Sequence, residues 1–234
     1  MEIGSEKWKD LIQTGARDFG IQLNPTQLDQ FSAHAAELIQ WTRRINLTAI
    51  TDPLAVAVKH FLDSIATANS IPPDAVLLDI GSGGGFPGLP LKIVIPSLSV
   101  TLIDASHKKV SFMKHVIRSL KLVNIDALHT RAEELARSRT YGQAFDVIVS
   151  RALSDIDTFV CLSLPLLAKD GMMIALKGTP SPNEIQTLKR RFRSFQHGSR
   201  NRLQKPTITV KNYTLPYLGL KRSIFRIKID EYRK

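Results

Sequence analysis

The chain of 234 residues contains one cysteine, Cys161. A single thiol cannot form an intrachain disulfide, a zinc cluster or a CxxC redox pair. The 6 histidines show no HxxH or HxxxH spacing, so one helix cannot present two of them to a metal. We therefore expect no metal.

Long apolar runs are also missing. No stretch approaches the roughly 20 apolar residues that a membrane-spanning helix needs. The first residues, MEIGSEKWKDLIQ, lack the basic-then-apolar order of a signal peptide. We expect a cytoplasmic protein with no membrane partner. The 43% hydrophobic content is enough for one good-sized core with a small appended lobe, and we expect a monomer.

Acidic residues are absent from residues 185–229, which carry twelve Lys and Arg, so the net charge of +11 is local. The densest part is residues 189–205, KRRFRSFQHGSRNRLQK. Such a run is either a solvated face or a surface that contacts phosphates. The lack of any acid to pair the charges favours the second interpretation. The candidate RNA-binding residues of this run are Arg190, Arg191, Arg193, Arg200 and Arg202.

The first part of the chain has a helical pattern. Asn24 can cap a helix, Pro25 suits its first turn, and apolar residues then recur at helical spacing up to Ile45. A second helix is expected over residues 53–69, before two prolines. We therefore predict an N-terminal helical lobe over residues 1–72.

From residue 75 onward, short apolar strands alternate with helical stretches, a pattern typical of a parallel sheet covered on both faces. This predicts an α/β domain over residues 73–234 with a mostly parallel doubly wound sheet. Period-two patterning on both sides of PYLG predicts an antiparallel hairpin at one edge of the sheet. The expected strands are 75–80, 99–105, 125–130, 145–152, 171–178, 207–215 and 222–229, with helices at 89–95, 107–120 and 156–168.

A glycine-rich loop, GSGGGFPG, follows the first strand, where ligands of such sheets bind. Its Gly83-x-Gly85-x-x-Gly88 spacing, with Asp104 at the end of the second strand, formally matches the dinucleotide fingerprint. Pro87, however, lacks an N–H that a phosphate would need. The candidates are a dinucleotide, a nucleoside without phosphate such as S-adenosylmethionine, or a tight turn with no ligand. The number of glycines favours the nucleoside.

The same residues carry a resemblance to a known family. The chain resembles the bacterial small-subunit ribosomal RNA methyltransferase G family, also called the glucose-inhibited division protein B family. The resemblance covers residues 41–229 and rests on WTRRINLTAI, HFLDS, LLDIGSGGGFPGLPL, VTLIDASHKKVSFMKHV, TRAEEL, FDVIVSRAL and LLAKDGMMIALKG. It implies a Rossmann-like class I methyltransferase that transfers a methyl group from S-adenosylmethionine to N7 of a guanine in 16S ribosomal RNA.

The resemblance also implies roles for individual residues. Arg151 would face the transfer site and orient the substrate. The chain departs from the family pattern at Thr42, where the family usually has Asn, and at ASHKK, where it often has SLxKR. The implied cofactor residues are Gly81, Ser82, Gly83, Gly85 and Phe86 beside the methionine part, Asp104, Ala105 and Ser106 beside the ribose, Ala132 and Glu133 beside the adenine, and Arg151. The implied residues of the cofactor rim or RNA rim are Asn46, His60, Lys108, Lys109, Arg131, Lys177 and Arg222.

The residue chemistry agrees with a ring nitrogen as methyl acceptor. Guanine N7 carries a lone pair and no proton, so no general base is needed. The chain has VSRA where methyltransferases of exocyclic amines usually carry Asn/Asp-Pro-Pro. Methylation at carbon five of a pyrimidine needs a cysteine nucleophile, but Cys161 lies among apolar residues of an expected helix, so we interpret it as a core residue. Three alternatives stay open: an NAD-dependent oxidoreductase, for which no YxxxK pair is present, a methyltransferase of another RNA, and a non-catalytic RNA-binding protein.

Overall fold

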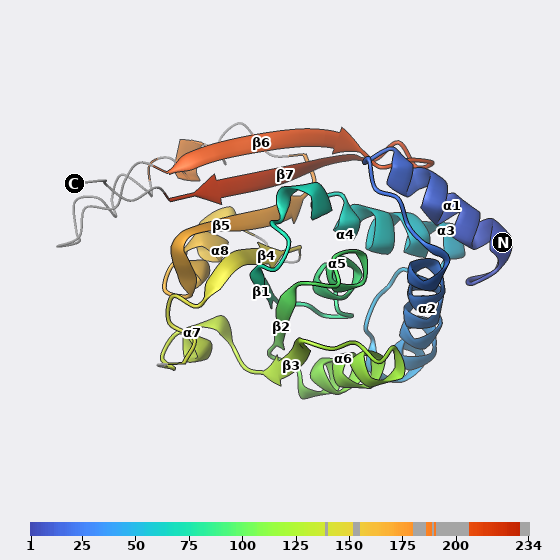
Figure 1. The fold of residues 1–234 in the computed structure, drawn as a ribbon, viewed down its shortest axis with the longest axis horizontal. Coiled ribbons are helices and arrows are strands. Elements are labelled where there is room, and N and C mark those ends of the chain that lie inside the picture. The colour runs from blue at the N-terminus through green and yellow to red at the C-terminus, as the bar shows by residue number, and fades with distance from the viewer. Residues whose placement is uncertain (139, 152–154, 180–185, 189, 191–205, 230–234) are drawn as a thin grey trace.

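A seven-stranded sheet in the order β3-β2-β1-β4-β5-β7-β6 forms the centre of the molecule (Figure 1). The computed structural model describes residues 1–234 except 139, 152–154, 180–185, 189, 191–205 and 230–234. The first five strands of that order are parallel, and β7 runs antiparallel to both β5 and β6. The predicted doubly wound sheet with a C-terminal hairpin at its edge is confirmed. The strands are β1 (Val76–Ile80), β2 (Ser99–Asp104), β3 (Ile125–His129), β4 (Phe145–Ser150), β5 (Leu167–Lys177), β6 (Thr207–Thr214) and β7 (Lys221–Lys228).

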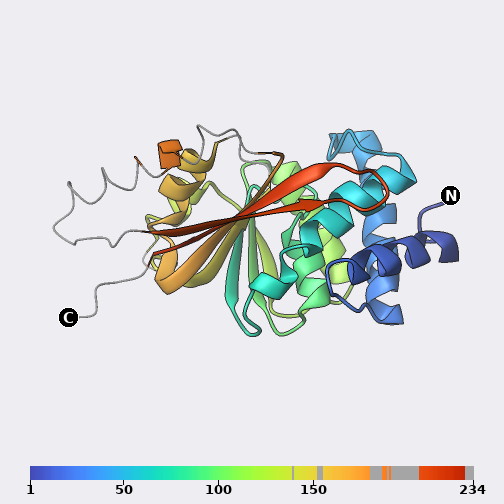
Figure 2. The same ribbon diagram turned by 90° about the horizontal axis from the view of Figure 1, so that it is seen from above.

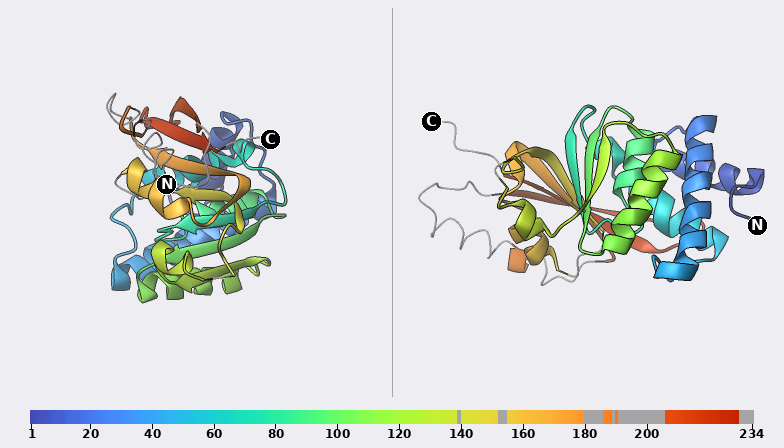
Figure 3. Two further views of the ribbon diagram at one scale, coloured as in Figure 1. Left: turned by 90° about the vertical axis from the view of Figure 1, so that its left-hand side faces the viewer. Right: turned by 90° about the horizontal axis from the view of Figure 1, so that it is seen from below.

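Side chains of the central strands alternate between two hydrophobic clusters, one on each face of the sheet. Leu77 lies in one cluster and its neighbour Leu78 in the other. Figures 2 and 3 show α7 (Ala132–Leu135) and α8 (Ile156–Ser163) on one face of the sheet, whereas the N-terminal helices, α5 (Gly88–Val94) and α6 (His107–Ser119) lie on the other. Burial on both faces explains why the strands are nearly continuous apolar runs.

The N-terminal helices pack on the sheet through the same cluster as α5 and α6. Trp8, Phe31 and Phe61 form its aromatic centre, with ring centroids 5.8 Å (Trp8–Phe61) and 5.0 Å (Phe31–Phe61) apart. The N-terminal α-helices are α1 (Glu6–Arg17), α2 (Pro25–Ile45), α3 (Pro53–Val56) and α4 (Asp63–Ile65). No bounds for α1 were predicted from the sequence.

The helix that begins at Pro25 is confirmed in detail. Asn24 accepts a hydrogen bond from the backbone N–H of Gln27, and the Gln27 side chain accepts one from the Asn24 N–H, which completes a capping box. The helix ends at Asn46, which adopts a left-handed conformation. Its buried face is continuous from Leu28 to Leu38.

The helix predicted over residues 53–69 is present over residues 53–65 and ends earlier than expected. It consists of α3, a π-helical turn (Ala57–Leu62) and α4, and a 3₁₀ turn (Ala68–Ser70) follows it. The apolar pattern did not indicate the change of hydrogen-bond step within this helix. The π-helical turn carries Lys59 and His60.

The expected boundary between the last helix and the fifth strand is also wrong. Helix α8 ends at Ser163 instead of continuing to residue 168, and β5 begins at Leu167. Pro165 has no N–H to continue the helix, and Leu167 already pairs with Phe145 of β4. Apolar residues that looked helical therefore belong to the sheet.

None of the helices among the described residues is both long enough and apolar enough to cross a bilayer. The division of the chain at residue 72 stays a prediction, since the helices and the sheet share one hydrophobic cluster.

Candidate functional site

The glycine loop lies at the carboxyl edge of the parallel strands, directly after β1. Gly81 has a φ of +72°, and a Cβ built on it would meet no atom within 4 Å. At the other end of the loop, a Cβ on Gly88 would overlap a methyl carbon of Leu102 and lie 2.9 Å from a carboxyl oxygen of Asp79. The loop is thus tightly packed behind and open in front, so a ligand can approach the backbone at Gly81.

Asp104 joins the end of β2 to this loop. Its Oδ2 accepts a hydrogen bond from the Gly83 N–H at 3.0 Å, and its Oδ1 accepts one from the Ser106 N–H at 2.8 Å. The Lys109 ammonium lies 3.9 Å from Oδ2. A carboxylate has about four acceptor positions, so Asp104 can brace the loop and still accept hydrogen bonds from ribose hydroxyls.

Asp79, on β1, supports the loop from within the core. It is fully buried, and its Oδ2 accepts a hydrogen bond from the Gly88 N–H at 2.9 Å. Its Oδ1 has no hydrogen-bond partner. Burial raises the pKa of this carboxyl to about 7, although the hydrogen bond from Gly88 and the charge of Arg151 oppose the rise.

Phe86 of the loop lies between two histidines of the N-terminal helices. Its ring is stacked on His34 at 4.8 Å and on His60 at 4.7 Å between centroids, with interplanar angles of 14° and 13°. The Arg151 guanidinium carbon lies 4.9 Å from the centroid of Phe86. Phe86 therefore contacts both the N-terminal helices and the arginine that follows β4.

Arg151 is held by the π-helical turn of the N-terminal region. It donates one hydrogen bond to the Lys59 carbonyl at 2.7 Å and one to His60 Nδ1 at 3.0 Å. A guanidinium can only donate, so His60 accepts at Nδ1, and its other nitrogen carries the hydrogen and donates to Thr48 Oγ1 at 2.9 Å. Burial, with the Arg151 charge second, lowers the pKa of His60 to about 3, so the ring is neutral at pH 7.

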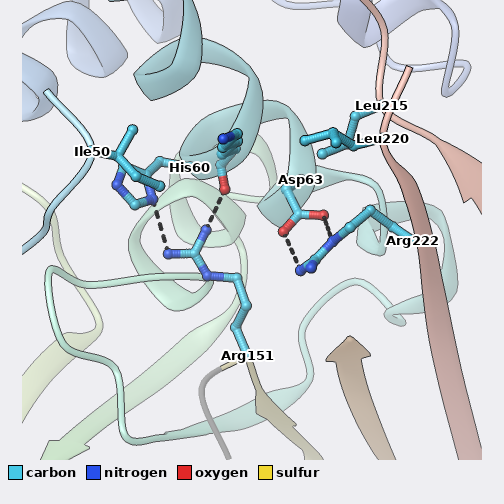
Figure 4. A pocket seen from close by; sticks show the side chains of 8 residues that line it. Ile50, His60, Asp63, Arg151, Leu215, Leu220 and Arg222 are labelled. Atoms are coloured by element: carbon cyan, nitrogen blue, oxygen red, sulfur yellow. Dashed lines mark hydrogen bonds and ion pairs between the residues drawn. The ribbon is translucent and has the colours of Figure 1, made fainter. Parts of the chain in front are cut away.

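A cavity of about 370 Å³ opens beside Arg151, between the N-terminal helices, the end of β4 and the turn of the C-terminal hairpin. Figure 4 shows Arg151 on one side and the Asp63–Arg222 pair on another. The lining combines the apolar side chains of Ile50, Leu215 and Leu220 with polar and charged groups, which are Lys59, His60, Asp63, Arg151 and Arg222.

Asp63 fixes the C-terminal hairpin to the N-terminal helices. Its buried carboxylate accepts hydrogen bonds from Arg222 Nε at 3.0 Å and Arg222 Nη2 at 2.8 Å, and from the Tyr213 hydroxyl at 2.5 Å. Bidentate pairing of this kind is strong and directional. The structure thus places Arg222 in an ion pair at the wall of the cavity, whereas the sequence analysis expected it on a rim.

The predicted ribose and adenine residues lie along the ends of β2 and β3. Ser106 precedes α6 as its N-terminal capping position and is half-buried, and Ala105 is exposed. Ala132 is buried at the start of α7, whereas Glu133 and the preceding Arg131 are exposed. The ends of the two strands are adjacent, because Asp104 of β2 pairs with His129 of β3.

The predicted rim residues are more dispersed. Lys108 is exposed and Lys109 is half-buried in the first turn of α6, Asn46 is exposed at the end of α2, and Lys177 is half-buried at the end of β5. Arg190 is exposed. Arg191, Arg193, Arg200 and Arg202 lie outside the described residues.

Four residues of the site were missed by the sequence analysis. Asp63 and Asp79 lie within the motifs HFLDS and LLDIG without any pattern that assigns them a role. His34 occupies a buried position of the α2 pattern, which was a detectable signal, because a histidine is unusual on an apolar face. Tyr213 had no signal, since its partner Asp63 is 150 positions away. Among the described residues, no group of three His, Cys, Asp or Glu side chains is arranged to hold a metal.

The fold is Rossmann-like, of the class found in S-adenosylmethionine-dependent methyltransferases. Solved structures of low sequence identity share it. A SAM-dependent methyltransferase from Aquifex aeolicus superposes with a TM-score of 0.53 at 16% identity, over 78% of this chain and 96% of that one. TYW2 of M. jannaschii in complex with AdoMet superposes with a TM-score of 0.55 at 15% identity, over 73% of this chain and 77% of that one.

The chain belongs to the rRNA small subunit methyltransferase G family, whose model matches residues 27–207. The protein of that name from Geobacter sp. (strain M21) is 42% identical over 216 residues, which cover 92% of this chain and 95% of the relative. The one from Geotalea uraniireducens (strain Rf4) is 49% identical over 185 residues, covering 79% and 84%. The family's activity is S-adenosylmethionine-dependent methylation of a 16S rRNA guanine at N7.

Proposed function

We propose that this chain transfers a methyl group from S-adenosylmethionine to N7 of one guanine in 16S rRNA, with Arg151 orienting the base. The observation that carries the proposal is the position of Arg151. It contacts Phe86 of the glycine loop and also lines the 370 Å³ cavity. One side chain therefore touches both the loop proposed for the cofactor and the cavity proposed for the base.

On the cofactor side, the open backbone at Gly81 suits the close approach of an uncharged sugar and an amino-acid chain. The bound cofactor supplies a methyl group activated by its positive sulfur. Gly81, Ser82, Gly83, Gly85 and Phe86 hold the methionine part, Asp104 with Ala105 and Ser106 holds the ribose, and Ala132 and Glu133 border the adenine. The neighbouring ends of β2 and β3 support this assignment.

On the substrate side, the cavity has the composition that a purine requires. Ile50, Leu215 and Leu220 provide apolar contact for the ring faces, and Arg151 has N–H groups beyond the two that bond Lys59 and His60. A hydrogen bond from Arg151 to guanine O6 turns the adjacent N7 toward the cofactor. N7 would use its own lone pair to bond the methyl carbon as the methyl–sulfur bond breaks, which would leave sulfur as a neutral thioether and move the positive charge to the base. The chain therefore needs to position the base and exclude water but not to remove a proton.

The cavity is too small for a duplex, so the guanine enters as a single unstacked base, as in other enzymes that modify bases. Positively charged side chains bind the surrounding phosphates. We assign this role to Lys108, Lys109, Arg131, Lys177, Arg190, Arg191, Arg193, Arg200 and Arg202, and we propose that the uncharged Asn46 contacts the RNA by hydrogen bonds. His60 and Arg222 act at the cavity.

Ribosomal RNA as the substrate places the reaction in the cytoplasm, and we propose that the enzyme acts there as a monomer. The working division of the chain is a helical lobe over residues 1–72 and a methyltransferase domain over residues 73–234.

The test is transfer of labelled methyl from S-adenosylmethionine to small ribosomal subunits and to naked 16S rRNA from cells that lack the protein, followed by nucleoside analysis. We expect label in 7-methylguanosine at a single site. Label in a different nucleoside, or only in another RNA, would overturn the substrate assignment. Cofactor binding without any transfer would favour a non-catalytic RNA-binding protein.

A further inference from the structure

His34 is a buried histidine of α2, and the reaction does not require a base at its position. Its exposed fraction is 0%, and its ring lies among Phe61, Phe86 and Phe112. It is a polar residue on a face that otherwise reads Leu, Phe, Ala and Leu. Burial of a polar side chain has a free-energy cost unless its hydrogen bonds are replaced.

One polar contact compensates that cost, and it is made to the glycine loop. His34 Nε2 lies 2.8 Å from the carbonyl oxygen of Gly84. A carbonyl can only accept, so Nε2 carries the hydrogen and donates it. Desolvation lowers the pKa of His34 to about 4, so the ring is neutral at pH 7. The other ring nitrogen, Nδ1, has no hydrogen-bond partner.

The Gly84 carbonyl lies at the middle of the loop, in the same peptide unit as the Gly85 N–H, which donates to the Ser82 carbonyl within the loop. The loop is fixed near its start by the Gly83 N–H on Asp104, and near its end by the N–H groups of Gly85 and Phe86 on the Ser82 carbonyl. The contact from His34 is the one described side-chain hydrogen bond that reaches this peptide unit from the N-terminal helices. The same His34 ring also stacks on Phe86, a second residue of the loop.

We propose that His34 is a positioning residue for the cofactor loop: its hydrogen bond to Gly84 orders the loop before S-adenosylmethionine binds. This rests on the loop being the cofactor site of the proposed function. The N-terminal helices thus contribute to cofactor affinity without contacting the cofactor. Ordering the loop in advance lowers the entropy cost of binding.

The experiment compares two variants of the full-length protein. His34→Phe keeps an aromatic ring against Phe86 and removes the donor. His34→Gln keeps an N–H donor in a similar position and removes the ring. The matched control is Ser32→Ala, because Ser32 on the same helix donates to a backbone carbonyl within α2, that of Leu28, at 2.8 Å.

Affinity for S-adenosylmethionine is measured by calorimetry without RNA, and amide hydrogen exchange of Gly85 and Phe86 is measured without any ligand. We expect His34→Phe to weaken binding at least fivefold and to speed exchange in the loop, with Tm close to that of the wild type. His34→Gln is expected within about twofold of the wild-type Kd, and Ser32→Ala is expected to leave Kd unchanged. In steady-state assays His34→Phe should raise KM for the cofactor and leave kcat and KM for RNA unchanged.

A wild-type Kd and wild-type exchange in His34→Phe would overturn the proposal. If His34→Phe does not fold, His34→Leu is the second donorless variant. Failure of both to fold while His34→Gln folds would make His34 a residue of stability only and would also overturn it. Because binding is measured without RNA, failure of the rRNA assignment would leave this result unaffected.

Discussion

The two halves of the candidate site are built in different ways. Most of the cofactor half, from Val76 to Asp104, is local: 29 consecutive positions supply a strand, a loop, a helix and a second strand. The substrate half unites His60 and Asp63, Arg151, and Arg222 from three distant parts of the chain. A local motif can be recognised in sequence, whereas an assembled cavity depends on how separate elements pack. Substitutions should therefore affect cofactor binding and base positioning separately.

The largest difference between the effect on base positioning and the effect on cofactor binding is expected for Arg151→Ala. Loss of the guanidinium removes the donor for the base and the contacts with Lys59 and His60. We expect single-turnover methylation to fall by about 10²–10³-fold, the usual cost of losing a preorganised donor, with Kd for the cofactor changed far less. Arg17→Ala, at an exposed arginine of α1, is the control. A rate within tenfold of wild type would remove Arg151 from the positioning role.

Asp104→Asn is expected to weaken cofactor binding more than base positioning. The amide cannot accept charge-assisted hydrogen bonds from Gly83 and Ser106 or from the ribose as well as the carboxylate does. We expect binding of S-adenosylmethionine to weaken by about 1–3 kcal/mol in calorimetry. Asp126→Asn, on the neighbouring strand β3, should bind normally. Unchanged affinity in Asp104→Asn would exclude this carboxylate from the cofactor site.

A smaller effect on stability is expected for Tyr213→Phe. The variant loses one hydrogen bond to the buried Asp63 carboxylate, which keeps its pair with Arg222. A hydrogen bond to a charged group contributes about 1.5 kcal/mol or more, so urea unfolding should show a loss of about that size. In Tyr141→Phe, where the ring is stacked on Phe145, the change should stay within about 0.5 kcal/mol. Equal effects would mean that the Tyr213–Asp63 bond adds nothing.

The pH dependence of stability should report the three buried groups around the loop. Between pH 4 and 6.5, His34 and His60 are neutral when folded and charged when unfolded, because burial lowers their pKa from 6.5 to about 4 and about 3. Asp79 behaves oppositely: its pKa rises from 3.8 to about 7, so it is protonated only in the folded state. Taken together, these three groups therefore bind one more proton in the unfolded state than in the folded state. Their net contribution to the free energy of unfolding grows by about 1.4 kcal/mol per pH unit as pH rises.

Two variants change this slope in opposite directions. His34→Phe removes one histidine and should lower the slope by about 1.4 kcal/mol per unit, and Asp79→Asn should raise it by about as much. Urea unfolding at pH 4.5, 5.5 and 6.5 measures the differences, in which the other carboxylates cancel. Parallel curves for all three proteins would mean that these groups titrate normally in the folded state.

Much of the fold was predictable because its signals are local. The strands before residue 151 were predicted to within two residues, since burial on both faces makes each of them an apolar run bounded by polar turns. The errors fall where a tertiary contact overrides a local pattern. Leu167 joins β5 by pairing with Phe145, and the expected helix over 53–69 contains a π turn. That turn presents the Lys59 carbonyl and His60 to Arg151, a contact between residues 91 or 92 positions apart.

By itself, the sequence determined the class of fold, the family, and the strand–loop–strand unit with Asp104, because these depend on short-range patterns and on backbone conformations that glycine favours. Tertiary structure alone decided which polar groups became partners. Each of these contacts joins residues from different elements. They are the stack of Phe86 between His34 and His60, the hydrogen bond from Arg151 to His60, and the hydrogen bonds from Tyr213 and Arg222 to Asp63. The physical reason is that a buried polar group must find its hydrogen-bond partner wherever packing places one, at a sequence distance that no local pattern encodes.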